Sequence, residues 1–246
     1  MDKYIQTRDR RKIHYKLIGK GFPLIFLHGN NLNLNYFVKQ EVLAENHQLI
    51  LIDSRNHGDS ENQVTPLTFE QMADDVEGVL REERVNQCII IGHSDGANLG
   101  LMYAKQYPNR VRGMVLNGGN YRFSGLLWPV QIGIYFEIAA LGLLGKFSKK
   151  FANRYLVSRL MLDDVNITES DMKNITVPSI VIVGAWDMIK RSHSKEFAEH
   201  LGNGKLMIVP RTGHDVALHK TKEFNELINH FTEVVNKGES IENISF

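Results

Sequence analysis

The sequence has 246 residues, enough for one large domain, and its 43% hydrophobic and 23% charged residues are ordinary for a soluble globular protein. Its 29 basic and 28 acidic residues give a formal net charge of +1. This balance gives no electrostatic reason to expect nucleic acid or an acidic membrane surface as a partner. We therefore expect a small-molecule substrate and no nucleic acid.

Two features bear on the cellular location. The only cysteine is Cys88, so no intrachain disulfide can form, and the charged amino terminus lacks the apolar segment of a secretory signal. Both favour a cytoplasmic protein. Residues 126–145 are apolar with one charge, Glu137, and approach the length of a membrane span. Their proline, glutamine and three glycines oppose that interpretation, so we expect no stable span and instead an apolar helical cap over a binding pocket.

Eight segments have the pattern of strands. The first two flank a polar turn and predict an antiparallel hairpin, whereas the later ones are unbroken apolar runs typical of strands buried on both faces of a parallel sheet. In chain order they are Tyr4–Thr7, Lys12–Leu17, Leu24–Leu27, Gln48–Ile52, Gln87–Ile91, Val111–Leu116, Ser179–Val183 and Lys205–Val209.

Helical patterns alternate with these strands, at Thr68–Arg84, Ala97–Tyr107, Ser192–Leu201 and Val216–Val235. Such alternation predicts an α/β fold, with a mostly parallel eight-stranded sheet flanked by helices. No strand pattern occurs in residues 120–174, which we interpret as an inserted helical lid. The core would then comprise residues 1–119 and 175–246.

The segment GHSDG, residues 92–96, follows an apolar strand and precedes a helix. A serine in this setting occupies a sharp, strained turn, and the two glycines allow the strand and the helix to pack closely. The turn would display the hydroxyl of Ser94 above the sheet. In this context the motif predicts a nucleophile.

A serine nucleophile needs a base, and the base needs a group that orients it. Candidates are expected in the loops that follow the carboxyl ends of parallel strands. Asp187 follows the strand Ser179–Val183, and His214 follows the strand Lys205–Val209. The predicted catalytic residues are therefore Ser94, Asp187 and His214, in the chain order of α/β hydrolases.

Further motifs agree with this assignment. His28-Gly29 follows the third strand, residues 53–60 read D-x-R-x-x-G-x-S, and Val177-Pro178 precedes the strand that leads to the acid. From Tyr4 to Val235 the sequence resembles the α/β-hydrolase superfamily, specifically its small serine esterase-like members with a helical lid.

The resemblance implies an oxyanion hole made by the backbone N–H groups of Asn30 and Asp95, with Asn31 as an alternative donor. Asn30 and Asp95 both depart from the residues usual in the family. The Asp95 carboxylate could stabilise the helix start or attract a cationic substrate group.

These observations predict a carboxylic ester hydrolase that forms an acyl-enzyme with small, largely apolar acyl or aromatic substrates. Trp128, Tyr135 and Phe136 of the lid are the expected substrate contacts, and no metal or organic cofactor is expected. Cleavage of lactones, amides or carbon–carbon bonds by the same triad is an alternative, and so is a small-molecule receptor or signalling partner with little turnover. The protein would be a monomer or a homodimer.

Overall fold

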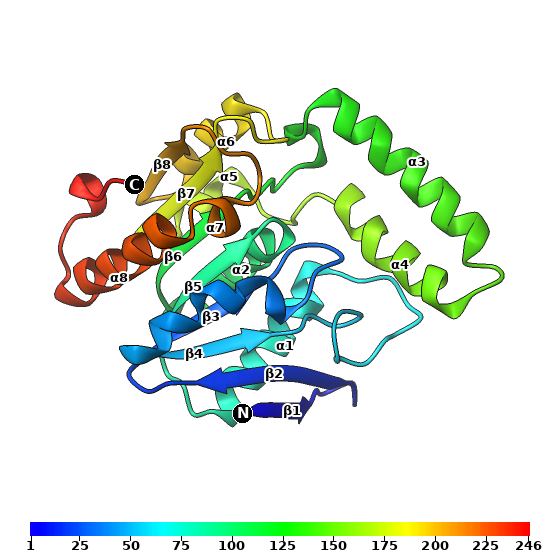
Figure 1. Ribbon diagram of the computed structural model, residues 1–246, viewed down its shortest axis with the longest axis horizontal. Coiled ribbons are helices and arrows are strands. Elements are labelled where there is room, and N and C mark those ends of the chain that lie inside the picture. Colours follow the sequence, from blue (N-terminus) through cyan, green and yellow to red (C-terminus); the bar gives the residue numbers. More distant parts are fainter.

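The structure is a computed structural model that describes residues 1–246. Its eight strands form one sheet in the order β1-β2-β4-β3-β5-β6-β7-β8 (Figure 1). Antiparallel pairing is limited to β1 with β2 and β2 with β4, so the predicted mostly parallel eight-stranded sheet is confirmed. The strands are β1 Asp2–Gln6, β2 Lys12–Ile18, β3 Phe22–Leu27, β4 His47–Ile52, β5 Cys88–His93, β6 Val111–Asn117, β7 Ser179–Gly184 and β8 Gly204–Val209.

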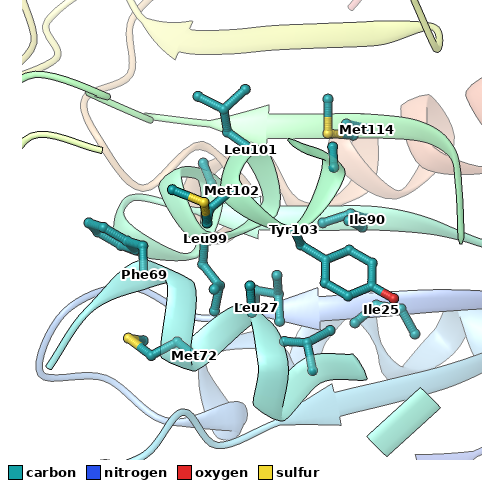
Figure 2. Close-up of a cluster of buried hydrophobic side chains, with 14 of the residues drawn as sticks. Ile25, Leu27, Phe69, Met72, Ile90, Leu99, Leu101, Met102, Tyr103 and Met114 are labelled. Carbon is teal, nitrogen blue, oxygen red and sulfur yellow. The ribbon is translucent and has the colours of Figure 1, made fainter. Parts of the chain in front are cut away.

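Helices cover both faces of this sheet. Figure 2 shows one face, where Phe69 and Met72 of one helix and Leu99 and Met102 of another pack on Leu27 and its neighbours from the central strands. Phe224 and Ile228 of a third helix belong to the core on the other face. The helices are α1 Phe69–Glu82, α2 Asp95–Gln106, α3 Trp128–Leu144, α4 Lys149–Arg159, α5 Glu169–Lys173, α6 Arg191–His200, α7 Val216–His219 and α8 Thr221–Lys237.

One predicted helix is divided. Residues 216–235 have a continuous helical pattern, but Lys220 adopts φ −125° and ψ 47°, and the chain forms α7 and α8 instead. The Thr221 hydroxyl donates to the carbonyls of Ala217 and Leu218, which stabilises the break. The change of direction allows α8 to lay its apolar side on the sheet. The sequence prediction of one helix was wrong here because side-chain periodicity continues through the break.

Residues 34–45 form a helical element that was not predicted from the sequence. They wind in short 3-10 turns, with a kink at Phe37, and pack against β4. Polar residues interrupt the apolar positions in this segment, so a regular helical pattern is lacking.

The segment between β6 and β7 holds α3, α4 and α5 and no strand. Helices α3 and α4 pack against each other and extend beyond the sheet (Figure 1). Their shared interior contains Ile134 and Ile138, together with Leu126 and Ile189 at the base of the insertion. None of the helices is both long and apolar enough to cross a membrane.

Buried histidines make stability depend on pH. Burial lowers the pKa of His57 to about 3 and that of His193 to about 4. In the unfolded chain both would have a pKa near 6.5, so as the pH falls from 6.5 to 4 only the unfolded state gains their protons. We therefore expect the free energy of unfolding to fall over this range, by about 1.4 kcal/mol per pH unit for each such group.

Urea denaturation at pH 7 and pH 5 measures this loss. His193→Phe keeps an aromatic ring against Tyr121, whose ring centroid lies 4.6 Å away, and should make the stability less dependent on pH. The same change at the exposed His230 is the control and should leave the dependence intact. An identical pH slope in both variants would contradict the assignment.

Candidate active site

Ser94 lies between β5 and α2 in a strained backbone conformation, with φ 53° and ψ −120°. Its N–H donates to the Asn117 carbonyl at 2.8 Å, which ties the turn to β6. A Cβ at residue 96 would lie 1.9 Å from the Leu27 oxygen, and one at residue 92 would lie 2.4 Å from the Gly96 oxygen. Only glycine fits at both positions, because strand, turn and helix approach so closely.

Asp187 and His214 lie together beyond the carboxyl ends of β7 and β8. His214 donates through Nδ1 to Asp187 Oδ1 at 2.9 Å. The Asp187 carboxylate is buried and also accepts from the N–H groups of Gly184 and Ile189, at 3.4 and 3.3 Å. With its proton on Nδ1, the His214 ring keeps Nε2 as an acceptor. No hydrogen bond joins Nε2 to the Ser94 hydroxyl in this structure.

The His214 ring is confined by several neighbouring residues. A Cβ on Gly118, whose φ is +65°, would lie 2.7 Å from Cε1 of the ring. The His93 ring lies 4.8 Å away between centroids, and Tyr36 stacks on His93 at 4.3 Å. Asp215 lies 3.3 Å from His93 Nε2. These contacts join distant segments. The sequence marks only His93, which precedes Ser94 in the GHSDG segment, and Asp215, which follows His214.

The two predicted oxyanion donors have free backbone N–H groups. Neither the Asn30 N–H nor the Asp95 N–H donates to an acceptor in the protein. The alternative donor is occupied, because the Asn31 N–H donates to His57 Nε2 at 3.3 Å. The geometry therefore favours Asn30 over Asn31.

The side chains of Asn30 and Asp95 contact each other. The Asn30 amide donates to Asp95 Oδ2 at 2.8 Å and to the Val157 carbonyl of α4 at 2.7 Å. Asn98 donates to the other Asp95 oxygen at 3.4 Å. Burial raises the pKa of Asp95, while these two amides oppose the rise. The carboxylate thus holds the loop at residue 30 against α2, and Asn30 links both to the insertion.

The loop at residues 53–60 serves to tie segments together. Asp53 accepts from the N–H groups of Leu34 and Asp59, at 2.8 and 2.9 Å. Arg55 is buried and forms two hydrogen bonds of 2.6 Å to the Asp75 carboxylate on α1. These contacts hold the loop beside the site without directing either charged group at Ser94.

Trp128, Tyr135 and Phe136 lie on an exposed side of α3, with 69, 56 and 73% of their surface accessible. Their contact with substrate stays a prediction. A cavity of about 650 Å³ lies between residues 62–64 and the α3–α4 pair, and Ser94, Asp187 and His214 are not among its lining residues. No group of three or more His, Cys, Asp or Glu side chains is arranged to hold a metal ion.

Comparison with known proteins identifies the family to which the chain belongs. Residues 23–162, more than half of the chain, match the family described as the alpha/beta hydrolase fold. The chain belongs to the α/β hydrolase family. A segment is 33% identical over 101 residues to the sn-1-specific diacylglycerol lipase ABHD11 of Danio rerio, covering 40% of this chain and 32% of the relative. The matched segments span about a third of the length of this relative and of its Mus musculus counterpart.

Two similarities extend over nearly the whole hydrolase. The AB hydrolase superfamily protein YisY of Bacillus subtilis is 25% identical over 266 residues, covering 94% of this chain and 99% of the relative. The esterase EaEST of Exiguobacterium antarcticum has a TM-score of 0.83 at 20% identity, covering 95% of this chain and 100% of that one. The structural likeness concerns the fold, and the site residues rest on the geometry above.

Proposed function

We propose that this hydrolase is a serine esterase that cleaves small carboxylic esters through an acyl-enzyme. The conformation of Ser94 carries the proposal, because a non-glycine residue with positive φ at the start of a helix is strained and such strain concentrates at functional sites. The Asp187–His214 pair and the two free N–H groups support it.

In the proposed reaction, Ser94 Oγ attacks the ester carbonyl carbon and its proton passes to His214 Nε2. Asp187 stabilises the resulting imidazolium through the bond to Nδ1. The carbonyl oxygen becomes an oxyanion, which accepts from the N–H groups of Asn30 and Asp95. When the intermediate collapses, the alcohol leaves with the proton from His214.

Water then repeats the sequence on the acyl-enzyme. His214 removes a proton from the water, whose oxygen attacks the acyl carbon, and collapse returns the proton to Ser94 and releases the acid. We propose that residues 120–174 form a lid over Ser94. The hydrogen bond from Asn30 to Val157 supports this, because it joins the lid directly to the oxyanion loop.

A panel of p-nitrophenyl esters of increasing acyl length, combined with fluorophosphonate labelling, tests the proposal. We expect a burst of nitrophenol followed by steady turnover, and a label on the peptide that contains Ser94. His214→Ala should abolish both while leaving the fold intact. An absence of turnover and of labelling in the native protein would overturn the proposal and favour a ligand-binding role.

Lactones are a second substrate class that the same assay should include. The N-acyl homoserine lactone degrading enzyme Est816 shares this fold, with a TM-score of 0.79 at 23% identity, covering 93% of this chain and 100% of that one. A lactone is a cyclic ester, so the same proposed steps apply, except that the alcohol stays attached to the acyl group and water releases a single hydroxy acid. Amides and carbon–carbon substrates complete the panel. We also propose a cytoplasmic location, because the single cysteine, Cys88, is buried and free and no intrachain disulfide can form.

A further inference from the structure

The outward face of α3 is apolar along its whole length. Its inward face, with Ile134, Ile138 and Leu141, is buried in the insertion, and α4 is the main helix packed against it. On the opposite side apolar residues recur at helical spacing and stay exposed, and they are Trp128, Ile132, Phe136, Ala139 and Leu143, while the exposed Phe147 follows in the turn after the helix. A helix that is apolar on both sides needs a second apolar surface to cover it.

This face continues toward the proposed active site. The Leu127 N–H donates to the Met188 carbonyl at 2.9 Å, and both side chains are exposed. Trp186, two residues earlier, is 72% exposed. Asp187, the hydrogen-bond partner of His214, lies between Trp186 and Met188 in the chain. The exposed apolar surface therefore extends to the loop that contains Asp187.

Positive charge accompanies the apolar face. Lys146, Lys149 and Lys150 are exposed where α3 ends and α4 begins, and none of them forms an ion pair. The only carboxylate of the helix pair, Glu137, accepts from Ser158 at 3.0 Å and lies 3.7 Å from Arg154. Residues 128–159 hold five basic residues and one acidic residue, a formal charge of +4, whereas the whole chain carries +1. The rest of the chain therefore carries −3.

We propose that the outward face of α3, with Lys146, Lys149 and Lys150, docks the protein on an anionic lipid surface. Helix α3 would lie in the plane of the interface, with its aromatic and aliphatic side chains among the acyl chains and the lysines at the headgroups. A second copy of the chain fits less well, because its own α3 face offers no carboxylate to these lysines. Docking would bring lipid-borne esters to the lid, but the binding itself does not depend on Ser94.

Vesicle co-sedimentation tests the proposal with the full-length protein. We expect binding to vesicles of phosphatidylcholine with a quarter phosphatidylglycerol and little binding to pure phosphatidylcholine, with the difference reduced in high salt. The two tryptophans, Trp128 and Trp186, are both exposed, so their emission should shift to shorter wavelength on binding. Trp186→Phe isolates the signal of Trp128.

Matched variants separate charge from apolar contact. K146Q/K149Q/K150Q should weaken binding about 100-fold, because each lysine near an anionic surface contributes roughly a factor of five. The same change at the exposed Lys195, Lys222 and Lys237 of α6 and α8 should change it little.

F136S/L143S should weaken binding at least about tenfold, since two exposed apolar side chains lose their place in the interface. V38S/V42S is the control, because Val38 and Val42 are exposed to a similar degree, at 55 and 54%. Absence of binding to the phosphatidylglycerol vesicles, or binding that both sets of variants leave unchanged, would overturn the proposal. A stable dimer in sedimentation velocity that F136S/L143S dissociates would also overturn it, because a second copy would then cover this face.

Discussion

Replacing Ser94 by alanine is expected to lower kcat/KM on p-nitrophenyl esters by about 10⁴- to 10⁶-fold. The oxyanion donors and the binding surface remain, but no atom is left to form the acyl-enzyme. Fluorophosphonate labelling should disappear with the activity. A variant that keeps more than a few per cent of the native rate would show that Ser94 is not the nucleophile.

Stability measurements on the same position separate chemistry from folding. Alanine keeps the Cβ and therefore the strain at φ 53°, so S94A should unfold at nearly the same urea concentration as the native protein. Glycine has no such penalty at positive φ, and S94G should be more stable by about 1 kcal/mol. Both variants should be inactive. If S94G gained no stability, the turn would not be strained.

Replacing Arg55 by methionine is expected to reduce the free energy of unfolding by about 3–5 kcal/mol. The Arg55 side chain is almost completely buried and holds the buried Asp75 carboxylate with two hydrogen bonds of 2.6 Å. Methionine fills much of the volume but leaves the carboxylate without its partner. Urea denaturation at pH 7 measures the loss.

Arg11→Met is the matched control. Arg11 pairs with Glu61 at 2.8 Å, but the two side chains are 36 and 43% exposed, so this change should cost less than about 1 kcal/mol. The double variant R55M/D75L removes both buried charges and should regain much of the stability. Equal losses in R55M and R11M would contradict the importance of burial.

The cost of R55M should also depend on pH. Burial raises the pKa of Asp75 to about 6 even with Arg55 beside it, and removing Arg55 would raise that pKa further. At pH 5 the carboxyl of the variant would be protonated and neutral, so less charge is left unpaired than at pH 8. The difference in stability between the variant and the native protein should therefore be smaller at pH 5.

The strand and motif predictions succeeded because local patterns determine them. The strands β3 to β7 are built on apolar runs, and burial on both faces of the sheet requires that pattern. The positions of Asp187 and His214 followed from the same logic, since residues after parallel strands meet at one edge. The break at Lys220 escaped prediction because neighbouring side chains keep their helical period across it.

The sequence by itself determined the mostly parallel sheet, the turn at Ser94 and the chain order of the proposed catalytic residues, because each strand and each of these residues is marked by a local pattern of neighbouring residues. Only the tertiary structure decided that Asn30 joins Asp95 to Val157 and that His93 lies between Tyr36 and His214. It also decided which side of α3 stays exposed. The net charge of +1 does not reveal the positive charge of the α3–α4 pair. Composition adds up all the charges of the chain, whereas folding places the basic and acidic residues in different parts of the molecule.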